Sequence, residues 1–255
     1  MEMFLGGERY EVVSDLHTHT RYSHGRGSIE DVVKAAVAKG LKTIGISEHG
    51  PGHFGFGVPR KRLAEMKAEI IRLRRVYSDI EILFGIEANI LIERKCLDVK
   101  PEEFEYFDYI CAGWHFGAVD GITSASFRNT VQNFTRGTYE KGTRDQIRRN
   151  TDAVVRVVEA GGVKFVTHPG ARAPFDLFEI VTACANTGTL VELNANSMVF
   201  TPEMLKDIAN MIGEARFIIS SDAHRPERVG NFGRIEKLLN ESELDPARVE
   251  NLRKV

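Results

Sequence analysis

The stretch "EVVSDLHTHT" (residues 11–20) places an apolar run, Val12–Leu16, directly before His17 and His19. The run is typical of a buried strand, and the two histidines then fall in the loop that follows it. Side chains of alternate residues at a strand end point the same way, so His17 and His19 can bind one metal ion together. An isolated H-x-H pair also arises by chance, so the rest of the chain has to decide whether this pair is functional.

Strand-like and helix-like runs alternate along the rest of the chain. Ser28 and Asp31 are predicted to cap a helix that ends near Gly40, and Thr201 followed by Pro202 predicts another helix start. Six further strands are predicted at "KTIGIS" (42–47), "IEILFGIEAN" (80–89), "FDYICAGWH" (107–115), "VKFVTH" (163–168), "TLVELN" (189–194) and "ARFIISSD" (215–222).

These strands define the fold class. Seven β/α units with apolar strands indicate an α/β protein whose parallel sheet is buried on both faces. No G-x-G-x-x-G follows the first strand and no phosphate-binding P-loop motif occurs, so a closed or nearly closed barrel is favoured over an open nucleotide-binding sheet. A chain of 255 residues is a common length for one such barrel, so we predict a single domain over residues 1–255.

Composition narrows the class of protein further. A net charge of −2 argues against a dedicated nucleic-acid or membrane-surface protein. Cys96, Cys111 and Cys184 form no C-x-x-C pair, which suits a reducing compartment and excludes a thiolate-zinc framework. No signal peptide and no 18-residue apolar stretch is apparent. We therefore expect a soluble, cytoplasmic protein.

Histidines and acids recur where the predicted strands end. The carboxyl ends of all strands in a β/α barrel open on one face, where active sites are built. Scattered structural histidines have no reason to follow this rule, yet six of the seven strands deliver such a residue. The set comprises His17, His19, His49, Glu87, His115, His168, Asp222 and His224, and His24 and His53 lie in loops shortly after a strand.

Ligand chemistry follows from these residue types. Imidazole and carboxylate without thiolate suit zinc, manganese or iron. One catalytic zinc takes three or four protein ligands, whereas seven histidines (all except His53) with Glu87 and Asp222 make nine candidates. We therefore predict two or three divalent metal ions bridged by a carboxylate. Such a pair of ions holds a bridging hydroxide as nucleophile and neutralises both oxygens in a phosphoryl displacement.

Six motifs resemble those of the PHP (polymerase and histidinol phosphatase) family over about residues 12–236. They are, in order, "DLHTHT", "ISEH", "GIEANI", "AGWH", "THPG" and "SSDAH". "GIEANI" and "NTDAVVRVVEAGGVKFVTHPG" are most similar to the stand-alone bacterial phosphatases of this family. The resemblance implies a distorted seven-stranded TIM-like barrel with a trinuclear site that hydrolyses small phosphate monoesters, histidinol phosphate being one candidate substrate.

The resemblance also implies a ligand set. His17, His19 and Asp222 would hold one metal, and Glu87 would bridge it to a second metal held by His115 and His168. A third metal would take His24, His49 and His224. His24 is the weakest assignment, because the loop spacing after "HTHT" varies within the family.

Residues near these ligands are candidates for substrate contact. Arg172 and Arg225 follow metal-ligand motifs closely and can clamp a phosphate, and Arg26 is a weaker candidate of the same kind. His53, on a Gly-rich segment, can protonate a leaving alkoxide. Each also fits an ordinary surface position. The segment 117–145 is long for a β/α loop and is predicted as a lid.

Two other functions remain open from the sequence. A metal-dependent amidohydrolase or deaminase also begins with H-x-H, but its usual bridging lysine is replaced here by Trp114-His115 and Glu87 has no role in it. A PHP-type nuclease is the other alternative, since "RKRLAEMKAEIIRLRR" (60–75) carries seven basic residues on one predicted helix. A solvated outer helix explains the same pattern, so nucleic acid is not the expected partner.

Overall fold

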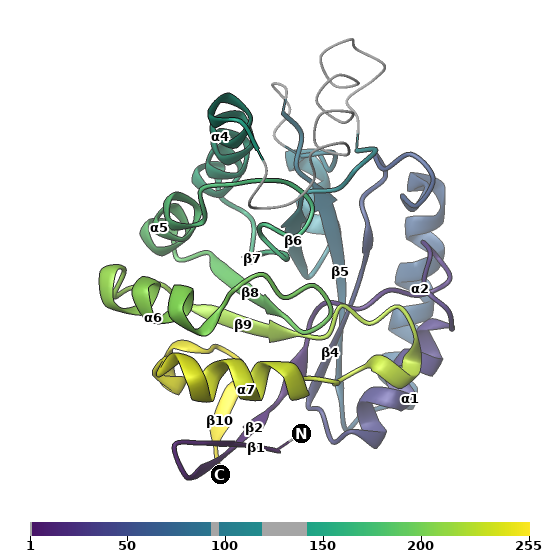
Figure 1. The fold of residues 1–255 in the computed structure, drawn as a ribbon. Coiled ribbons are helices and arrows are strands. Elements are labelled where there is room, and N and C mark those ends of the chain that lie inside the picture. Colours follow the sequence, from purple (N-terminus) through teal and green to yellow (C-terminus); the bar gives the residue numbers. More distant parts are fainter. Residues whose placement is uncertain (1, 93–96, 119–141) are drawn as a thin grey trace.

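Seven parallel strands form the centre of the molecule, which we describe from a computed structural model covering residues 2–92, 97–118 and 142–255. The strands pair in chain order, and the two end strands approach each other through a parallel bridge between Thr18 and Ala223. The predicted seven-stranded α/β barrel is therefore confirmed (Figure 1). The strands are β3 (Ser14–Asp15), β4 (Thr43–His49), β5 (Glu81–Asn89), β6 (Tyr109–Gly113), β7 (Phe165–Val166), β8 (Leu190–Asn194) and β9 (Phe217–Ser220).

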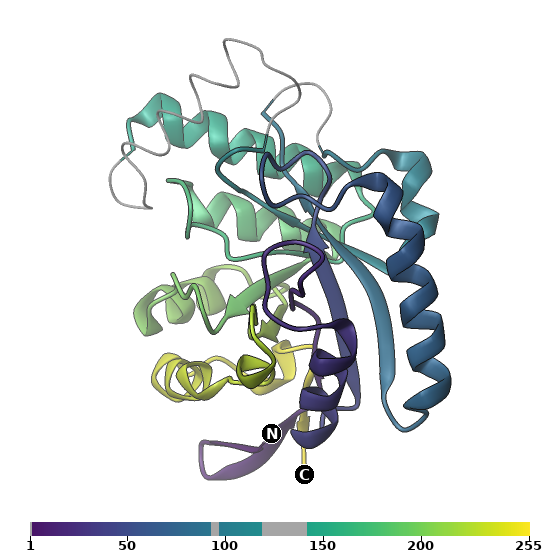
Figure 2. The same cartoon turned by 90° about the vertical axis from the view of Figure 1, so that its right-hand side faces the viewer.

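Helices cover the outside of these strands, as the two views in Figures 1 and 2 show. A short 3-10 helix, η1 (Pro101–Tyr106), stands between β5 and β6. Among the described residues no helix combines the length and apolar character that a membrane crossing requires. The α-helices are α1 (Ile29–Ala38), α2 (Arg60–Val76), α4 (Arg144–Ala160), α5 (Leu177–Thr187), α6 (Pro202–Met211) and α7 (Gly233–Ser242), with 3-10 turns η2 (Pro226–Arg228) and η3 (Pro246–Arg248).

Local sequence signals set the helix starts. Ser28 accepts a hydrogen bond from the backbone N–H of Asp31, whose carboxylate accepts one in return from the backbone of Ser28. Thr201 caps α6 directly before Pro202. Both predicted caps are confirmed, and each is worth about 1 kcal/mol to its helix.

A small antiparallel sheet at the chain termini was not predicted. It consists of β1 (Glu2–Leu5), β2 (Glu8–Val12) and β10 (Leu252–Lys254), with β2 in the middle. The predicted first strand, Val12–Leu16, is therefore wrong as one strand: Val12 pairs with Leu252 in this sheet, and the barrel begins at Ser14. β1 is only four residues long, and its exposed and buried residues alternate, so it offers no long buried apolar run to recognise.

The lower part of the barrel is filled by side chains. The hydroxyl of Tyr109 donates a hydrogen bond of 2.6 Å to the carbonyl of Leu16 inside the barrel. A Cβ on Gly45 or Gly85 would come within 2.1–2.2 Å of the Tyr109 side chain, so these two glycines make room for the ring. The interior cluster comprises Leu16, Tyr109, Cys111, Phe165, Leu190 and Ile218.

The basic helix α2 lies outside the barrel, and much of its charge is neutralised. Arg60 pairs with Glu103 at 2.7 Å and Arg72 with Glu30 at 3.0 Å. Arg74 pairs with Asp108. These ion pairs argue against α2 as a surface for a phosphate backbone, which needs basic groups that are free to contact it.

Candidate metal centre

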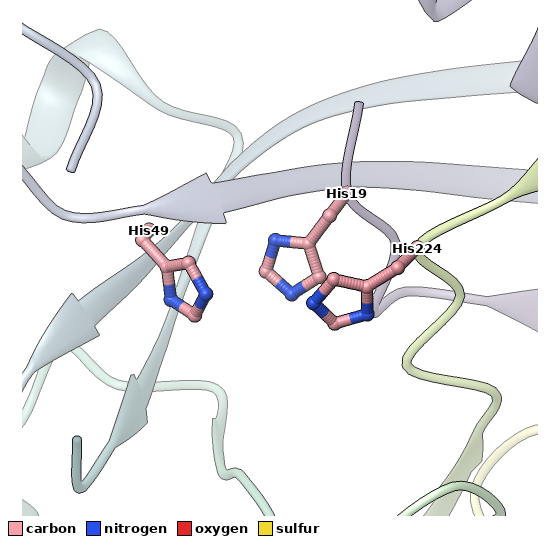
Figure 3. Close-up of side chains that lie close together, drawn as sticks. All are labelled: His19, His49 and His224. Atoms are coloured by element: carbon pink, nitrogen blue, oxygen red, sulfur yellow. The ribbon is translucent and has the colours of Figure 1, made fainter. Parts of the chain in front are cut away.

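The predicted histidines and acids meet at the carboxyl ends of the strands. Among the residues that the structure describes, four sets of three have ligand atoms that all lie within 4.8 Å of one another. Figure 3 shows one set, in which the ring of His19 lies beside those of His49 and His224, with centroids 4.5 and 4.4 Å away. The four sets are His19/His49/His224, His17/His19/Asp222, His17/Glu87/His168 and His49/Glu87/His115.

Glu87 lies at the middle of this cluster. It is fully buried on β5, and Thr167 Oγ1 donates a hydrogen bond of 2.7 Å to its Oε1. Five imidazoles surround its two oxygens, an arrangement suited to a carboxylate that bridges metal ions. To Oε1 the distances are 3.3 Å from His17 Nε2, 3.3 Å from His115 Nε2 and 3.0 Å from His168 Nε2; to Oε2 they are 2.9 Å from His49 Nδ1 and 3.6 Å from His19 Nε2.

Several of these buried atoms make no hydrogen bond of good geometry, His49 Nδ1 and Glu87 Oε2 among them although they lie 2.9 Å apart. The atoms concerned are His19 Nδ1, His49 Nδ1, Glu87 Oε2 and His115 Nε2. A buried polar atom without a partner costs about 1–3 kcal/mol, so a protein rarely keeps several together unless something binds them. Imidazole nitrogens and carboxylate oxygens are donors that divalent first-row metals take. The residues present therefore fit such ions.

The charges around the cluster favour the metal-binding form of Glu87 and His49 but not of His17 and His19. Burial raises the pKa of Glu87, but the neighbouring His115, His17 and His49 outweigh burial and hold that pKa well below its usual range. Burial and the positive charge of His19 lower the pKa of His49 well below its usual value. Glu87 is therefore ionised and His49 neutral, the forms in which each residue binds a metal.

Burial also lowers the pKa of His17 and His19, but neighbouring acids outweigh it at both residues. Glu192 outweighs burial at His17, whose pKa is well above its usual value, and Asp222 outweighs it at His19, whose pKa is about 9. These two imidazoles therefore release a proton when they bind a metal.

Two residues of the cluster have strained backbones. His168 and Asp222 have φ angles of 27° and 51°, in the left-handed region that residues other than glycine rarely adopt. Each such conformation costs about 1–3 kcal/mol and is found mostly at functional sites. Both residues lie just beyond a strand end, and both side chains point back to the cluster.

Two residues that support the imidazoles, Glu192 and Asn89, were not predicted from the sequence. Glu192 on β8 accepts hydrogen bonds of 2.6 Å from His17 Nδ1 and 2.6 Å from the backbone N–H of His168. Asn89 accepts one of 2.8 Å from His115 Nδ1. Such partners fix the tautomer and orientation of a ligating imidazole. The available signal was an acid inside the apolar run "TLVELN", because a carboxylate is not buried there without partners.

His24 and His53 lie at the edge of the cluster. The His24 ring is 4.9 Å from that of His49 and 4.3 Å from that of His224, but His24 belongs to none of the four sets. The His53 ring is 5.4 Å from that of His49. The roles of His24 as a ligand and of His53 as a proton donor stay predictions.

Two neighbouring cavities locate the predicted arginines. Arg172 lines a cavity of about 220 Å³ above the cluster, together with His53. Arg225 lines a second cavity of about 560 Å³. Arg26 is not among the described lining residues of either, although its backbone N–H donates to the carbonyl of His224. Most of the predicted lid, residues 119–141 of 117–145, lies outside the described residues.

Comparisons with known proteins agree with this arrangement. The model of the PHP domain family matches residues 15–220, so the chain belongs to that family. The chain is 27% identical over 247 residues to a "probable phosphatase" of Acetivibrio thermocellus, covering 91% of this chain and 88% of the relative. It is 26% identical over 249 residues to the "probable phosphatase YcdX" of Escherichia coli O81, covering 93% and 89%.

A solved structure has a similar fold. Histidinol phosphate phosphatase from Lactococcus lactis, crystallised with zinc, L-histidinol and phosphate, superposes with a TM-score of 0.60. The match covers 92% of this chain and 95% of that one, at 18% sequence identity. At this identity the similarity concerns the fold.

Proposed function

We propose that this protein is a metal-dependent phosphatase that hydrolyses small phosphate monoesters. The observation that carries the proposal is the buried Glu87 carboxylate with five imidazoles around it at the carboxyl ends of the strands. Membership of the PHP family and the phosphatase names of the relatives support the same reaction class.

In this proposal the residues divide into ligands and substrate contacts. Divalent ions bound here would supply Lewis-acid stabilisation of the phosphoryl oxygens and a more acidic water. One ion would take His17, His19 and Asp222, a second His115 and His168 with Glu87 shared between them, and a third His49 and His224 with His24. This assignment explains why nine ligand candidates gather in one place.

The remaining side chains of the smaller cavity would bind and orient the ester. Arg172 can hold a phosphoryl oxygen by a charge-assisted hydrogen bond. His53 would carry the proton that the leaving alkoxide needs. Phe56 and Phe116 also line this cavity and would exclude water from the organic part of the substrate.

The amidohydrolase alternative is not favoured by the geometry. At the end of β6, where that class usually has its bridging lysine, the chain has Gly113 followed by Trp114 and His115. The central position among the imidazoles is taken by Glu87 from β5. A carboxylate there suits a metal pair that acts on a phosphoester.

Metal analysis with an ester panel tests the proposal. We expect bound metal by elemental analysis, hydrolysis of p-nitrophenyl phosphate with added manganese or zinc, and loss of activity after chelation that the same metal restores. Fully metallated protein that is inactive against a broad panel of monoesters would contradict the proposed reaction.

A double variant tests the ligand assignment separately. His17→Ala with His19→Ala should remove at least one metal per chain and lower kcat/KM by about a thousandfold, because several kcal/mol of transition-state stabilisation are lost. Circular dichroism should stay as in the wild type, since the interior packing below His17 is untouched. Full metal content and activity in this variant would contradict the assignment.

A further inference from the structure

The larger cavity is rich in arginine. Arg225, Arg228 and Arg234 line it together with Asn196 and Asn231, and its volume is about 560 Å³. Its wall also includes Asp222 and His224, which line the smaller cavity over the metal centre as well. The two cavities therefore adjoin, and one small molecule can extend from the metal centre into the arginine-lined space.

The three guanidinium groups have no counter-charge among the described residues. Within the part of the chain that the structure describes, Arg225, Arg228 and Arg234 form neither an ion pair nor a side-chain hydrogen bond. Asp222 is the one carboxylate among the described residues of the wall, and it stands at the boundary with the metal centre. Several exposed arginines elsewhere do pair with acids, as Arg60 does with Glu103.

The arginine side chains indicate which kind of ligand this cavity binds. Guanidinium groups match the geometry of phosphate and carboxylate oxygens and bind them by paired, charge-assisted hydrogen bonds. Three like charges on one wall repel each other until an anion binds. The adjacent metal centre already has Arg172 in its own cavity for the scissile phosphate. The larger cavity therefore provides for an anion other than the one that is cleaved.

We propose that the substrate carries a second anionic group, a phosphate or carboxylate, which binds to Arg225, Arg228 and Arg234 while the first phosphate lies at the metal centre. This inference rests on the proposed phosphatase function and adds the substrate class. It also changes the role expected for Arg225: this residue binds the second anion and not the phosphate that is cleaved. Arg225 and Arg228 lie in the connection between β9 and α7, and Arg234 lies in the first turn of α7, so this part of the chain selects the substrate.

Matched substrates test the second-anion subsite. Glycerol 3-phosphate and 3-phosphoglycerate differ by one carboxylate, and fructose 6-phosphate and fructose 1,6-bisphosphate differ by one phosphate. We expect the wild-type enzyme to show a kcat/KM at least about tenfold higher for the member with the extra anion, given the usual strength of a charged hydrogen bond. Equal kcat/KM within both pairs would overturn the proposal.

A double variant identifies the residues. Arg228→Gln with Arg234→Gln should lower kcat/KM for the doubly anionic members by about tenfold or more, and leave p-nitrophenyl phosphate hydrolysis unchanged. Lys61→Gln with Arg75→Gln on α2 is the matched control, since it removes two exposed charges outside the cavity. An equal loss for every ester, or the same loss in the control, would overturn the assignment.

Binding measurements separate this proposal from the proposed function. Calorimetry on metal-loaded protein compares 3-phosphoglycerate with glycerol 3-phosphate in the wild type and the Arg228→Gln/Arg234→Gln variant. A preference for 3-phosphoglycerate that the variant loses would keep the anion subsite even if no ester were hydrolysed. Activity on p-nitrophenyl phosphate without that preference would keep the phosphatase function and overturn the subsite.

Discussion

The barrel interior consists of two layers of side chains. The same strands contribute residues to both layers, and the residue in the upper layer comes two positions after the residue in the lower layer. Leu190 and Ile218 belong to the lower, apolar layer, whereas Glu192 and Ser220 stand above them on β8 and β9. Residues two apart on a strand face the same side, so each pair shares one inward row. On β5 the lower position is Gly85, which yields its space to Tyr109, and the upper position is Glu87.

The difference between the layers shows how one scaffold separates stability from chemistry. The lower layer buries apolar groups, which contribute about 25 cal/mol per Å² to folding. The upper layer holds the polar atoms that make no hydrogen bond of good geometry and lies next to the strained residues His168 and Asp222. Such features cost stability and are retained where a ligand repays them. Mutations in the two layers should therefore affect different measurements.

Glu192→Gln should have the largest effect among the variants that test the difference between the two layers. The variant keeps the shape of the side chain but removes the charge that accepts the hydrogen bond of 2.6 Å from His17 Nδ1. Loss of such a partner typically costs about 10- to 100-fold in metal affinity or activity. We expect that loss in metal titration and in kcat/KM.

The control for this variant is Glu214→Gln, which removes an exposed carboxylate away from the barrel interior. We expect it to behave as the wild type. If Glu192→Gln also kept wild-type metal affinity and activity, the upper layer would not orient the ligands as its geometry indicates.

Gly113→Ala probes the upper layer through sterics alone. A Cβ at Gly113 would stand 2.6 Å from Glu87 Oε1 and 2.5 Å from Thr167 Oγ1, too close for the present arrangement. Glu87 must then shift; if Glu87 holds metal as we propose, a displacement of about 1 Å costs up to about 100-fold in rate. We expect kcat to fall about tenfold, because the crowded atoms are side-chain ends that can partly relax.

Gly213→Ala is the matched control, since no heavy atom lies within 4 Å of a Cβ built there. We expect full activity and unchanged or slightly higher stability. Wild-type kcat in Gly113→Ala, measured at saturating substrate and metal, would show that the position of Glu87 is not closely constrained.

Much of the fold follows from local patterns in the sequence. Apolar runs predicted six of the barrel strands and the place of the first, and Ser28 and Thr201 marked helix starts correctly. The terminal antiparallel sheet was missed because it joins β2 to β10 from the far end of the chain. No local pattern announces a pairing of that kind, and the same limit applies to the break between Val12 and Ser14.

The residues of the site likewise divide into those that the sequence predicts and those that only the fold reveals. His17, Glu87 and Asp222 were predictable because each follows or ends an apolar run, and the barrel brings those ends together. Glu192 lies in the middle of a strand, where its burial and its hydrogen bonds to His17 and His168 reveal its role. The arginine-lined cavity depends on the fold, which brings Asn196 from the segment after β8 into the same wall as Arg228 and Arg234, and spacing in the sequence does not specify this.

Ile218→Val is the smallest change and tests the lower layer by itself. Ile218 is 1% exposed, and removing one methylene from such a site usually costs about 0.5–1.5 kcal/mol of unfolding free energy. Urea denaturation of the metal-free protein should show that loss, while metal content and kcat/KM of the loaded enzyme should match the wild type. The chemistry should be spared because Ser220 and Glu192, not Ile218, face the imidazoles. A fall in kcat/KM comparable with that of Gly113→Ala would mean that the two layers are coupled, so that packing below the metal centre positions its ligands as directly as the hydrogen bonds around them.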